Sequence, residues 1–286
     1  MAGDPRRDCR PARLIFGGEA VPLAAVSDIE MYYEVCGAGP PLLITSGWAK
    51  AERAHAYHRD LFARHYTCIR HDHRGMGRSG SPPAPWTTET MGDDLAGLLD
   101  HLQLENVRVL GGGGMGGLVA AQLAIRHPSK VRSLFLGAGC AKADPFLAAV
   151  MGVWKDLYRL DRALWAREVT LWVLTPETFN TKPDLPATSA RTRAAEDTFP
   201  APGAFERTVD AYLSHDVTQT LRQIRCPTLV NCGGYEDLIT GPRYARELWA
   251  RIPGAELAIQ ENTSHANWVE KADEWGGLVL DWFART

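Results

Sequence analysis

Residues 107 to 117 read Val-Arg-Val-Leu-Gly-Gly-Gly-Gly-Met-Gly-Gly. The apolar run from Val107 to Leu110 is typical of a short buried strand, and the residues from Leu118 to Ala124 open a helix that ends near His127 and Pro128. Because glycine has no Cβ, it permits a sharp turn and lets a helix approach a sheet closely. The stretch therefore predicts a buried strand that turns abruptly into a helix.

The turn has the frame G-x-S-x-G, in which a serine on a sharp strand-to-helix turn serves as the nucleophile. Here the frame runs from Gly112 to Gly116, and Gly114 stands where the serine is expected. Because glycine offers no attacking atom, no covalent acyl intermediate can form at this position. Glycine also suits the strained backbone of such a turn and leaves space for a substrate atom.

Composition and charge exclude several classes of function. The chain has 286 residues and a net charge of -3, with no basic footprint for nucleic acid or an anionic membrane. No run approaches the ~18 apolar residues of a membrane span, and the first 13 residues lack an apolar signal core, so we expect a cytoplasmic protein. The 6 cysteines show no paired metal-ligand spacing, so we expect reduced thiols and no bound metal.

Strands and helices alternate along most of the chain, which predicts a mostly parallel α/β sheet with helices on both faces. We expect residues 1–19 to form an N-terminal extension, and residues 20–140 and 215–286 to form the core. The alternation breaks at residues 141–214, which are helical and aromatic, with an interruption at the Pro/Thr-rich stretch Thr175 to Thr188. This segment is predicted to be a helical lid over the carboxyl edge of the sheet, where parallel sheets bind ligands.

Further motifs are arranged in a characteristic order around the glycine turn. They are Gly39-Pro40-Pro41-Leu42-Leu43-Ile44 leading to Ser46-Gly47-Trp48, Asp72-His73-Arg74-Gly75-Met76-Gly77-Arg78-Ser79, Pro227-Thr228-Leu229-Val230 with Gly233-Gly234-Tyr235-Glu236-Asp237, and Thr263-Ser264-His265. With the turn, they resemble the α/β-hydrolase superfamily over residues 20–284, in the lid-bearing branch of enol-lactone hydrolases, haloperoxidase-like esterases and polyketide-tailoring esterases. The resemblance implies an α/β-hydrolase fold with about eight strands and no cofactor.

The resemblance also implies catalytic positions, because the family triad runs nucleophile, acid, histidine along the chain. That order gives Gly114, Asp237 and His265. Asp237 would accept a hydrogen bond from one ring nitrogen of His265, fix its tautomer and stabilise the imidazolium. Asp144 and Glu236 are weaker candidates for the acid.

Backbone donors remain when a side chain is lost. The implied oxyanion site consists of the N–H groups of Trp48 and Met115, although Ser46-Gly47 replaces the family's usual His-Gly before Trp48. Asp72 and Arg74 are interpreted as structural.

Two further assignments concern a replacement nucleophile and the ligand pocket. Cys140 lies just past the neighbouring strand and could form a displaced dyad with His265; the alternative is a buried, inert thiol. Most lid aromatics should form the lid's own core, while a few line a pocket for a bulky hydrophobic or aromatic small molecule. The pocket candidates are Trp48, Phe146, Trp154, Tyr158, Trp165 and Trp268.

Three functional hypotheses follow. The favoured one is a non-hydrolytic enzyme of natural-product (polyketide-like) biosynthesis, in which the His265–Asp237 base and the oxyanion hole abstract a proton, leading to carbon–carbon bond formation or cyclisation. The second is a hydrolase in which His265 activates water directly or Cys140 attacks, or an esterase inactivated by replacement of its serine with Gly114. The third is a non-catalytic binding protein. A homodimer is compatible with all three.

Overall fold

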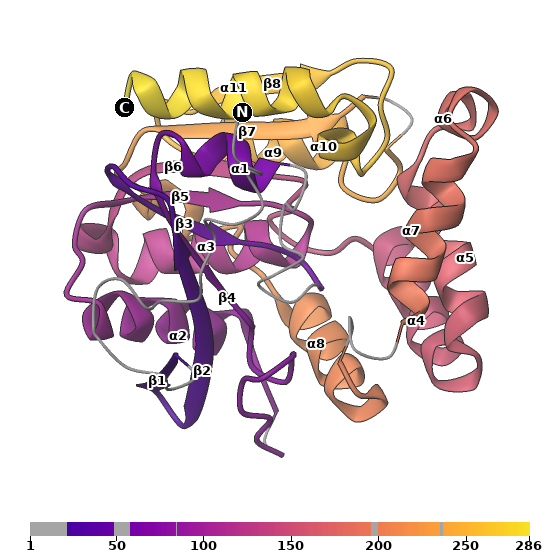
Figure 1. Ribbon diagram of the computed structural model, residues 1–286, viewed down its shortest axis with the longest axis horizontal. Coiled ribbons are helices and arrows are strands. Elements are labelled where there is room, and N and C mark those ends of the chain that lie inside the picture. The colour runs from indigo at the N-terminus through magenta and orange to yellow at the C-terminus, as the bar shows by residue number, and fades with distance from the viewer. Residues whose placement is uncertain (1–21, 49–57, 84, 196–199, 235–236) are drawn as a thin grey trace, which may run out of the picture.

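The computed structural model describes residues 22–48, 58–83, 85–195, 200–234 and 237–286 (Figure 1). The predicted extension at residues 1–19 and the candidate acid Glu236 lie outside these residues. Eight strands form one sheet: β1 (Leu23–Val26), β2 (Ile29–Cys36), β3 (Pro41–Thr45), β4 (Thr67–His71), β5 (Val107–Gly111), β6 (Val131–Gly137), β7 (Thr228–Gly233) and β8 (Glu256–Gln260).

The strand order places β5 in the middle of the sheet. The order is β1-β2-β4-β3-β5-β6-β7-β8, in which β1 and β2, and β2 and β4, pair antiparallel and all other neighbours pair parallel. This confirms the predicted mostly parallel α/β sheet. Because β5 is flanked by parallel strands on both sides, its carboxyl end opens at the edge where ligands bind in such sheets.

Helices cover both faces of the sheet. One face packs against α2 (Thr88–His101), α3 (Met115–Arg126) and α9 (Pro242–Arg251), and the other against α1 (Arg59–Ala63) and α11 (Ala272–Ala284). Successive strand residues point to opposite faces, so Leu43 joins the first core and its neighbour Leu42 the second. The short helices η3 (Pro128–Lys130), η4 (Leu221–Gln223) and α10 (Asn267–Glu270) complete the core.

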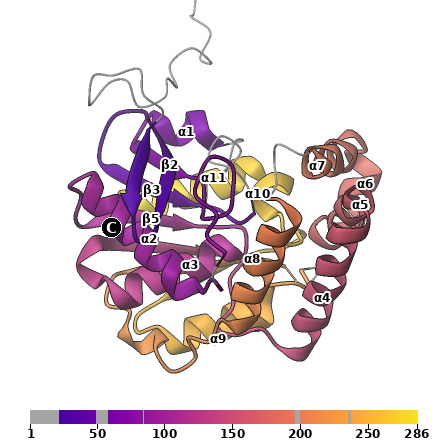
Figure 2. The same cartoon turned by 90° about the horizontal axis from the view of Figure 1, so that it is seen from below.

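Five helices lie between β6 and β7 at the carboxyl edge of the sheet. They are α4 (Pro145–Leu160), α5 (Arg162–Val173), α6 (Pro176–Thr181), α7 (Asp184–Ala194) and α8 (Pro202–Ser214). Figures 1 and 2 show α4 to α7 gathered to one side of the molecule, with α8 between them and the sheet. No helix among the described residues is long and apolar enough to cross a membrane.

The predicted interruption at Thr175 to Thr188 is wrong, because α6 and most of the first two turns of α7 lie within it. The Thr175 side chain accepts a hydrogen bond from the Thr178 N–H as the N-cap of α6, and Pro176 occupies the first turn. Proline is favourable there, since its missing N–H would have no partner within the helix and its φ angle is already helical. The same residues that suggest a break thus begin a helix.

Candidate active site

The chain turns sharply at Gly114 between β5 and α3. Gly114 has φ 73° and ψ -96°, and its carbonyl accepts hydrogen bonds from the N–H groups of Gly117 and Leu118. A Cβ at Gly116 would lie 2.5 Å from the Thr45 carbonyl oxygen, so a larger residue would separate α3 from β3. The glycines therefore permit both the left-handed turn and the close approach of the helix.

The space at Gly114 faces the candidate histidine. A Cβ built on Gly114 would lie 3.9 Å from Cε1 of His265, 3.8 Å from Cε2 of Tyr212 and 3.9 Å from the Ala138 carbonyl oxygen. These are ordinary van der Waals separations. The surroundings thus have room for a side chain at this position although the sequence provides none.

The two residues predicted to supply the oxyanion N–H groups both line the cavity beside Gly114. Met115 is the first residue of α3, so its N–H has no acceptor within the helix, and Trp48 follows the loop after β3; both residues line the cavity. A Cβ at Gly47 would lie 2.1 Å from the Gly113 carbonyl oxygen, so glycine is required where the two loops meet. His73 also braces this loop, because its Nε2 lies 2.9 Å from the Ser46 carbonyl oxygen and burial lowers its pKa to about 4.

His265 is held by a hydroxyl rather than by the predicted hydrogen bond to a carboxylate. Its Nδ1 lies 2.8 Å from Oγ1 of Thr240, whereas Oδ2 of Asp237 is 3.7 Å away. The other Asp237 oxygen, Oδ1, accepts hydrogen bonds from the N–H groups of Ile239 and Thr240, each at 2.9 Å. Oδ2 is buried and has no hydrogen-bond partner among the described residues. The carboxylate therefore caps a turn while its second oxygen faces the imidazole.

The other candidate acid and the candidate thiol are not at this site. Asp144 caps α4 by accepting from the Leu147 N–H and lies 3.3 Å from Arg243. Cys140 is 2 % exposed and does not line the cavity; burial raises the pKa of its thiol to about 12. A thiol with that pKa supplies almost no thiolate at neutral pH, so the displaced cysteine dyad is not supported.

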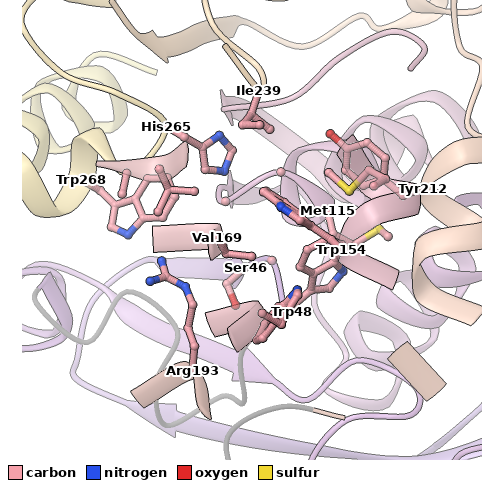
Figure 3. Close-up of a pocket in the computed structure, with 17 residues that line it drawn as sticks. Ser46, Trp48, Met115, Trp154, Val169, Arg193, Tyr212, Ile239, His265 and Trp268 are labelled. Atoms are coloured by element: carbon pink, nitrogen blue, oxygen red, sulfur yellow. The ribbon is translucent and has the colours of Figure 1, made fainter. Parts of the chain in front are cut away.

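A cavity of about 180 Å³ lies between the sheet edge and the lid (Figure 3). Its wall is mostly aromatic and aliphatic, with the glycine turns on one side and lid residues on the other. It is lined by Ser46, Gly47, Trp48, Gly113, Gly114, Met115, Met151, Trp154, Trp165, Val169, Val173, Arg193, Tyr212, Ile239, His265, Ala266 and Trp268.

Four of the six predicted pocket residues line the cavity, namely Trp48, Trp154, Trp165 and Trp268, and two do not. Tyr158 is buried inside the lid, where its ring stacks on Phe205 with centroids 3.9 Å apart. Phe146 is 42 % exposed and packs against Trp172. Both residues lie on α4, and the direction in which each side chain of a lid helix points depends on packing that the sequence pattern does not specify.

Two polar residues at this site, Thr240 and Arg193, were not predicted from the sequence. Thr240 hydrogen-bonds His265, and Arg193 lines the cavity. Neither carries a motif, although the position of Thr240 three residues after Asp237 is compatible with a turn that brings its hydroxyl back to the site.

The loop that carries His265 is attached to the lid by several hydrogen bonds. The Glu270 carboxylate accepts from the Ser264 N–H at 2.6 Å with one oxygen, and from Thr175 and Thr178 with the other. The Ala266 N–H donates to the Val173 carbonyl at 2.9 Å. The histidine loop and the end of α5 therefore form one connected unit.

A family model of the alpha/beta hydrolase fold matches residues 40–272. The chain belongs to the α/β-hydrolase family. A protein of Azorhizobium caulinodans with the name "Putative carbamate hydrolase RutD" is 30% identical over 266 residues, which cover 91% of this chain and 97% of that protein. A pimeloyl-[acyl-carrier protein] methyl ester esterase of Neisseria meningitidis serogroup A is 30% identical over 72% of this chain and 65% of its own. The enol-lactonase from Burkholderia xenovorans LB400 has 25% identity and a TM-score of 0.81, over 92% of this chain and 100% of its own.

These relatives correct the favoured functional hypothesis. Each of the three is named for hydrolysis, and none for carbon–carbon bond formation, cyclisation or natural-product biosynthesis. The expectation of a non-hydrolytic cyclase in this α/β-hydrolase is therefore wrong. It gave too much weight to the missing serine at Gly114 and too little to the family match over the rest of the chain.

Proposed function

We propose that this α/β-hydrolase hydrolyses an ester, a lactone or a related acyl compound by direct attack of water, with His265 as the general base. The observation that carries the proposal is the 3.9 Å between the His265 ring and the Cβ position of Gly114. A water molecule in the space between Gly114 and the His265 ring would take the place of the family's serine hydroxyl. Trp48 and Met115, whose N–H groups would bind the oxyanion, line the same cavity.

The step requires a particular tautomer of His265. In this tautomer Nδ1, 2.8 Å from Oγ1 of Thr240, would carry the proton and donate it to that hydroxyl, so that Nε2 can accept a proton from water. The resulting hydroxide adds to the carbonyl carbon, and the N–H groups of Trp48 and Met115 bind the oxyanion. The imidazolium then returns its proton to the leaving oxygen as the carbon–oxygen bond breaks, and no acyl-enzyme forms.

Hydrolysis by this route should be slower than in family members that keep the serine nucleophile. In serine hydrolases, loss of a triad member leaves catalysis about 10³ to 10⁴ above the reaction in water, from binding and the oxyanion hole. The Asp237 carboxylate, 3.7 Å from the imidazole, adds electrostatic stabilisation of the imidazolium. We expect modest rates on activated esters, and faster ones on a substrate that fits the cavity.

Hydrolysis of 4-nitrophenyl acetate tests the proposal. His265→Gln should lower kcat/KM by about 10² or more, the usual contribution of general acid–base catalysis. His65→Gln, which changes an exposed histidine outside the cavity, should leave the rate unchanged. Wild-type protein should also hydrolyse the ester more slowly in D₂O than in H₂O, because a proton leaves water in the rate-limiting step. A wild-type rate equal to that of buffer, or full activity in His265→Gln, would falsify the proposal.

A further inference from the structure

One carboxylate in the lid accepts hydrogen bonds from two indole rings. Glu168, a half-buried residue of α5, accepts from Nε1 of Trp154 in α4 with one oxygen and from Nε1 of Trp172 in α5 with the other. Hydrogen bonds to an ionised carboxylate are roughly twice as strong as those between neutral groups. Glu168 therefore fixes the orientation of both rings.

The two rings lie in different surroundings. Trp154 is 3 % exposed and lines the cavity, whereas Trp172 lies outside the cavity wall and packs against Phe146 with ring centroids 6.0 Å apart. Glu168 is not part of the cavity wall either, so the N–H of Trp154 is bound outside the cavity. The surface that Trp154 contributes to the cavity is therefore that of its carbon atoms.

Trp154 also contacts a residue of the proposed oxyanion site. Its ring centroid is 6.2 Å from that of Trp48, at an interplanar angle of 75°, and Figure 3 shows the two side chains next to each other. Edge-to-face pairs of aromatic rings prefer this geometry. A turn of the Trp154 ring would therefore change both the cavity wall and the contact with Trp48.

The cavity has room for only a compact body. Its volume of about 180 Å³ is close to the roughly 150 Å³ of an apolar cavity that binds benzene. On the lid side, Trp154, Trp165 and Val169 contribute ring and aliphatic surface. The space therefore suits about one aromatic ring or a short alkyl chain.

We propose that Glu168 is a positioning residue for Trp154, and that the substrate is a compact acyl compound whose apolar body, of about one aromatic ring, packs against the Trp154 ring. This assignment rests on the proposed hydrolytic function. Without the carboxylate, the buried indole N–H would lose its acceptor, and the ring would turn its polar edge toward the cavity. The apolar surface that receives the substrate would then be lost.

Binding of phenylacetone tests the assignment without turnover, because this ketone has a carbonyl group and an aromatic ring but no bond that hydrolysis can break. It is titrated into the full-length protein, and tryptophan fluorescence reports its binding. Glu168→Met keeps the length of the side chain but removes both acceptor oxygens, and should raise the Kd about tenfold. Glu168→Gln keeps one acceptor oxygen and should raise the Kd less. Glu177→Met, the same exchange at an exposed lid residue outside the cavity wall, should leave it unchanged.

A second set of variants separates the positioning of Trp154 from a general structural role. In a Trp154→Phe background the ring has no N–H to bind, so Glu168→Met should cause no further loss of affinity. Trp172→Phe removes only the other donor and should bind phenylacetone as wild-type protein does.

Three results would overturn the positioning role of Glu168: an unchanged Kd in Glu168→Met, an equal loss of affinity in both backgrounds, or failure of both Glu168 variants to fold. No binding of phenylacetone by wild-type protein would overturn the substrate class. Because no bond breaks in these experiments, their results are independent of whether the protein hydrolyses esters.

Discussion

At the scale of single residues, the two partners of His265 differ in distance and in charge. The Thr240 hydroxyl is 2.8 Å from Nδ1, and the Asp237 carboxylate oxygen is 3.7 Å away. The order of motifs along the chain could predict His265 and Asp237. It could not predict Thr240, because that contact depends on how the turn after Asp237 folds back, with both N–H groups of the turn bound to the same carboxylate oxygen.

Thr240→Val should lower kcat/KM for 4-nitrophenyl acetate about fivefold. The change preserves the shape of this buried side chain but removes the nearest acceptor for the Nδ1 proton, and a net hydrogen bond contributes about 1 kcal/mol. Asp237→Asn should cost more, since it removes the charge that stabilises the imidazolium as well as altering the preferred tautomer. Wild-type kinetics in Thr240→Val would mean that Asp237 alone orients the histidine.

At the scale of elements, the lid and the histidine loop are held together by Glu270. Its carboxylate, 6 % exposed, connects the Ser264 N–H to the start of α6 at Thr175 and Thr178. This buried side chain thus links the loop before His265 to the lid, together with the hydrogen bond from the Ala266 N–H to the Val173 carbonyl. Any movement of this end of the lid would displace the general base.

Glu270→Gln should loosen this connection, because an amide nitrogen cannot accept a hydrogen bond and one buried donor loses its acceptor at a cost of about 1–3 kcal/mol. We expect faster amide hydrogen exchange at Ser264 and Ala266 and about tenfold lower ester turnover. Glu177→Gln, an exposed change on α6, is the control and should alter neither. Unchanged exchange at Ser264 in Glu270→Gln would show that the loop keeps its position without the lid.

Some strands and helices could be predicted from the sequence more fully than others. The β5 strand, the turn at Gly114 and α3 follow from an apolar run, a glycine cluster and a second apolar run, each of which is a local signal. In the lid, Thr175 and Pro176 gave the wrong signal, because proline and threonine occur both in loops and at helix starts. The cavity-facing side chains of the lid depend on tertiary packing, which is why Arg193 was missed and Phe146 was included.

At the scale of the whole molecule, several histidines are buried in the neutral form. Burial lowers the pKa of His73 and of His215 to about 4 from the ordinary 6.5. His73 contacts the Ser46 carbonyl in the loop after β3, and His215 follows α8 with its Nδ1 2.7 Å from Oγ1 of Thr88 in α2. The fold therefore depends on these groups remaining unprotonated.

The free energy of unfolding should fall as the pH decreases below 6.5. The unfolded chain binds protons at these histidines from about pH 6.5, whereas the folded chain does not until about pH 4, so the stability present above pH 6.5 is lost across that interval. From pH 7 to pH 5 each histidine should cost about 2 kcal/mol. Urea unfolding at the two pH values measures the loss, and His215→Gln should reduce it by about 2 kcal/mol. Equal stability at pH 7 and pH 5 would contradict this expectation.

In the proposed reaction, water occupies the space beside Gly114, and His265 activates it there. Gly114→Ala and Gly114→Ser add the same Cβ at the same left-handed φ of 73°, with the same backbone cost of about 1–2 kcal/mol, and differ only by a hydroxyl. We compare both with wild-type protein in the initial rate of 4-nitrophenyl acetate hydrolysis. We expect the rate of Gly114→Ala to fall to that of His265→Gln, because the methyl group excludes the water. The rate of Gly114→Ser should exceed that of wild type by orders of magnitude, because the serine can form an acyl-enzyme. A Gly114→Ala rate equal to that of wild type would show that water attacks from elsewhere and would contradict the proposed reaction.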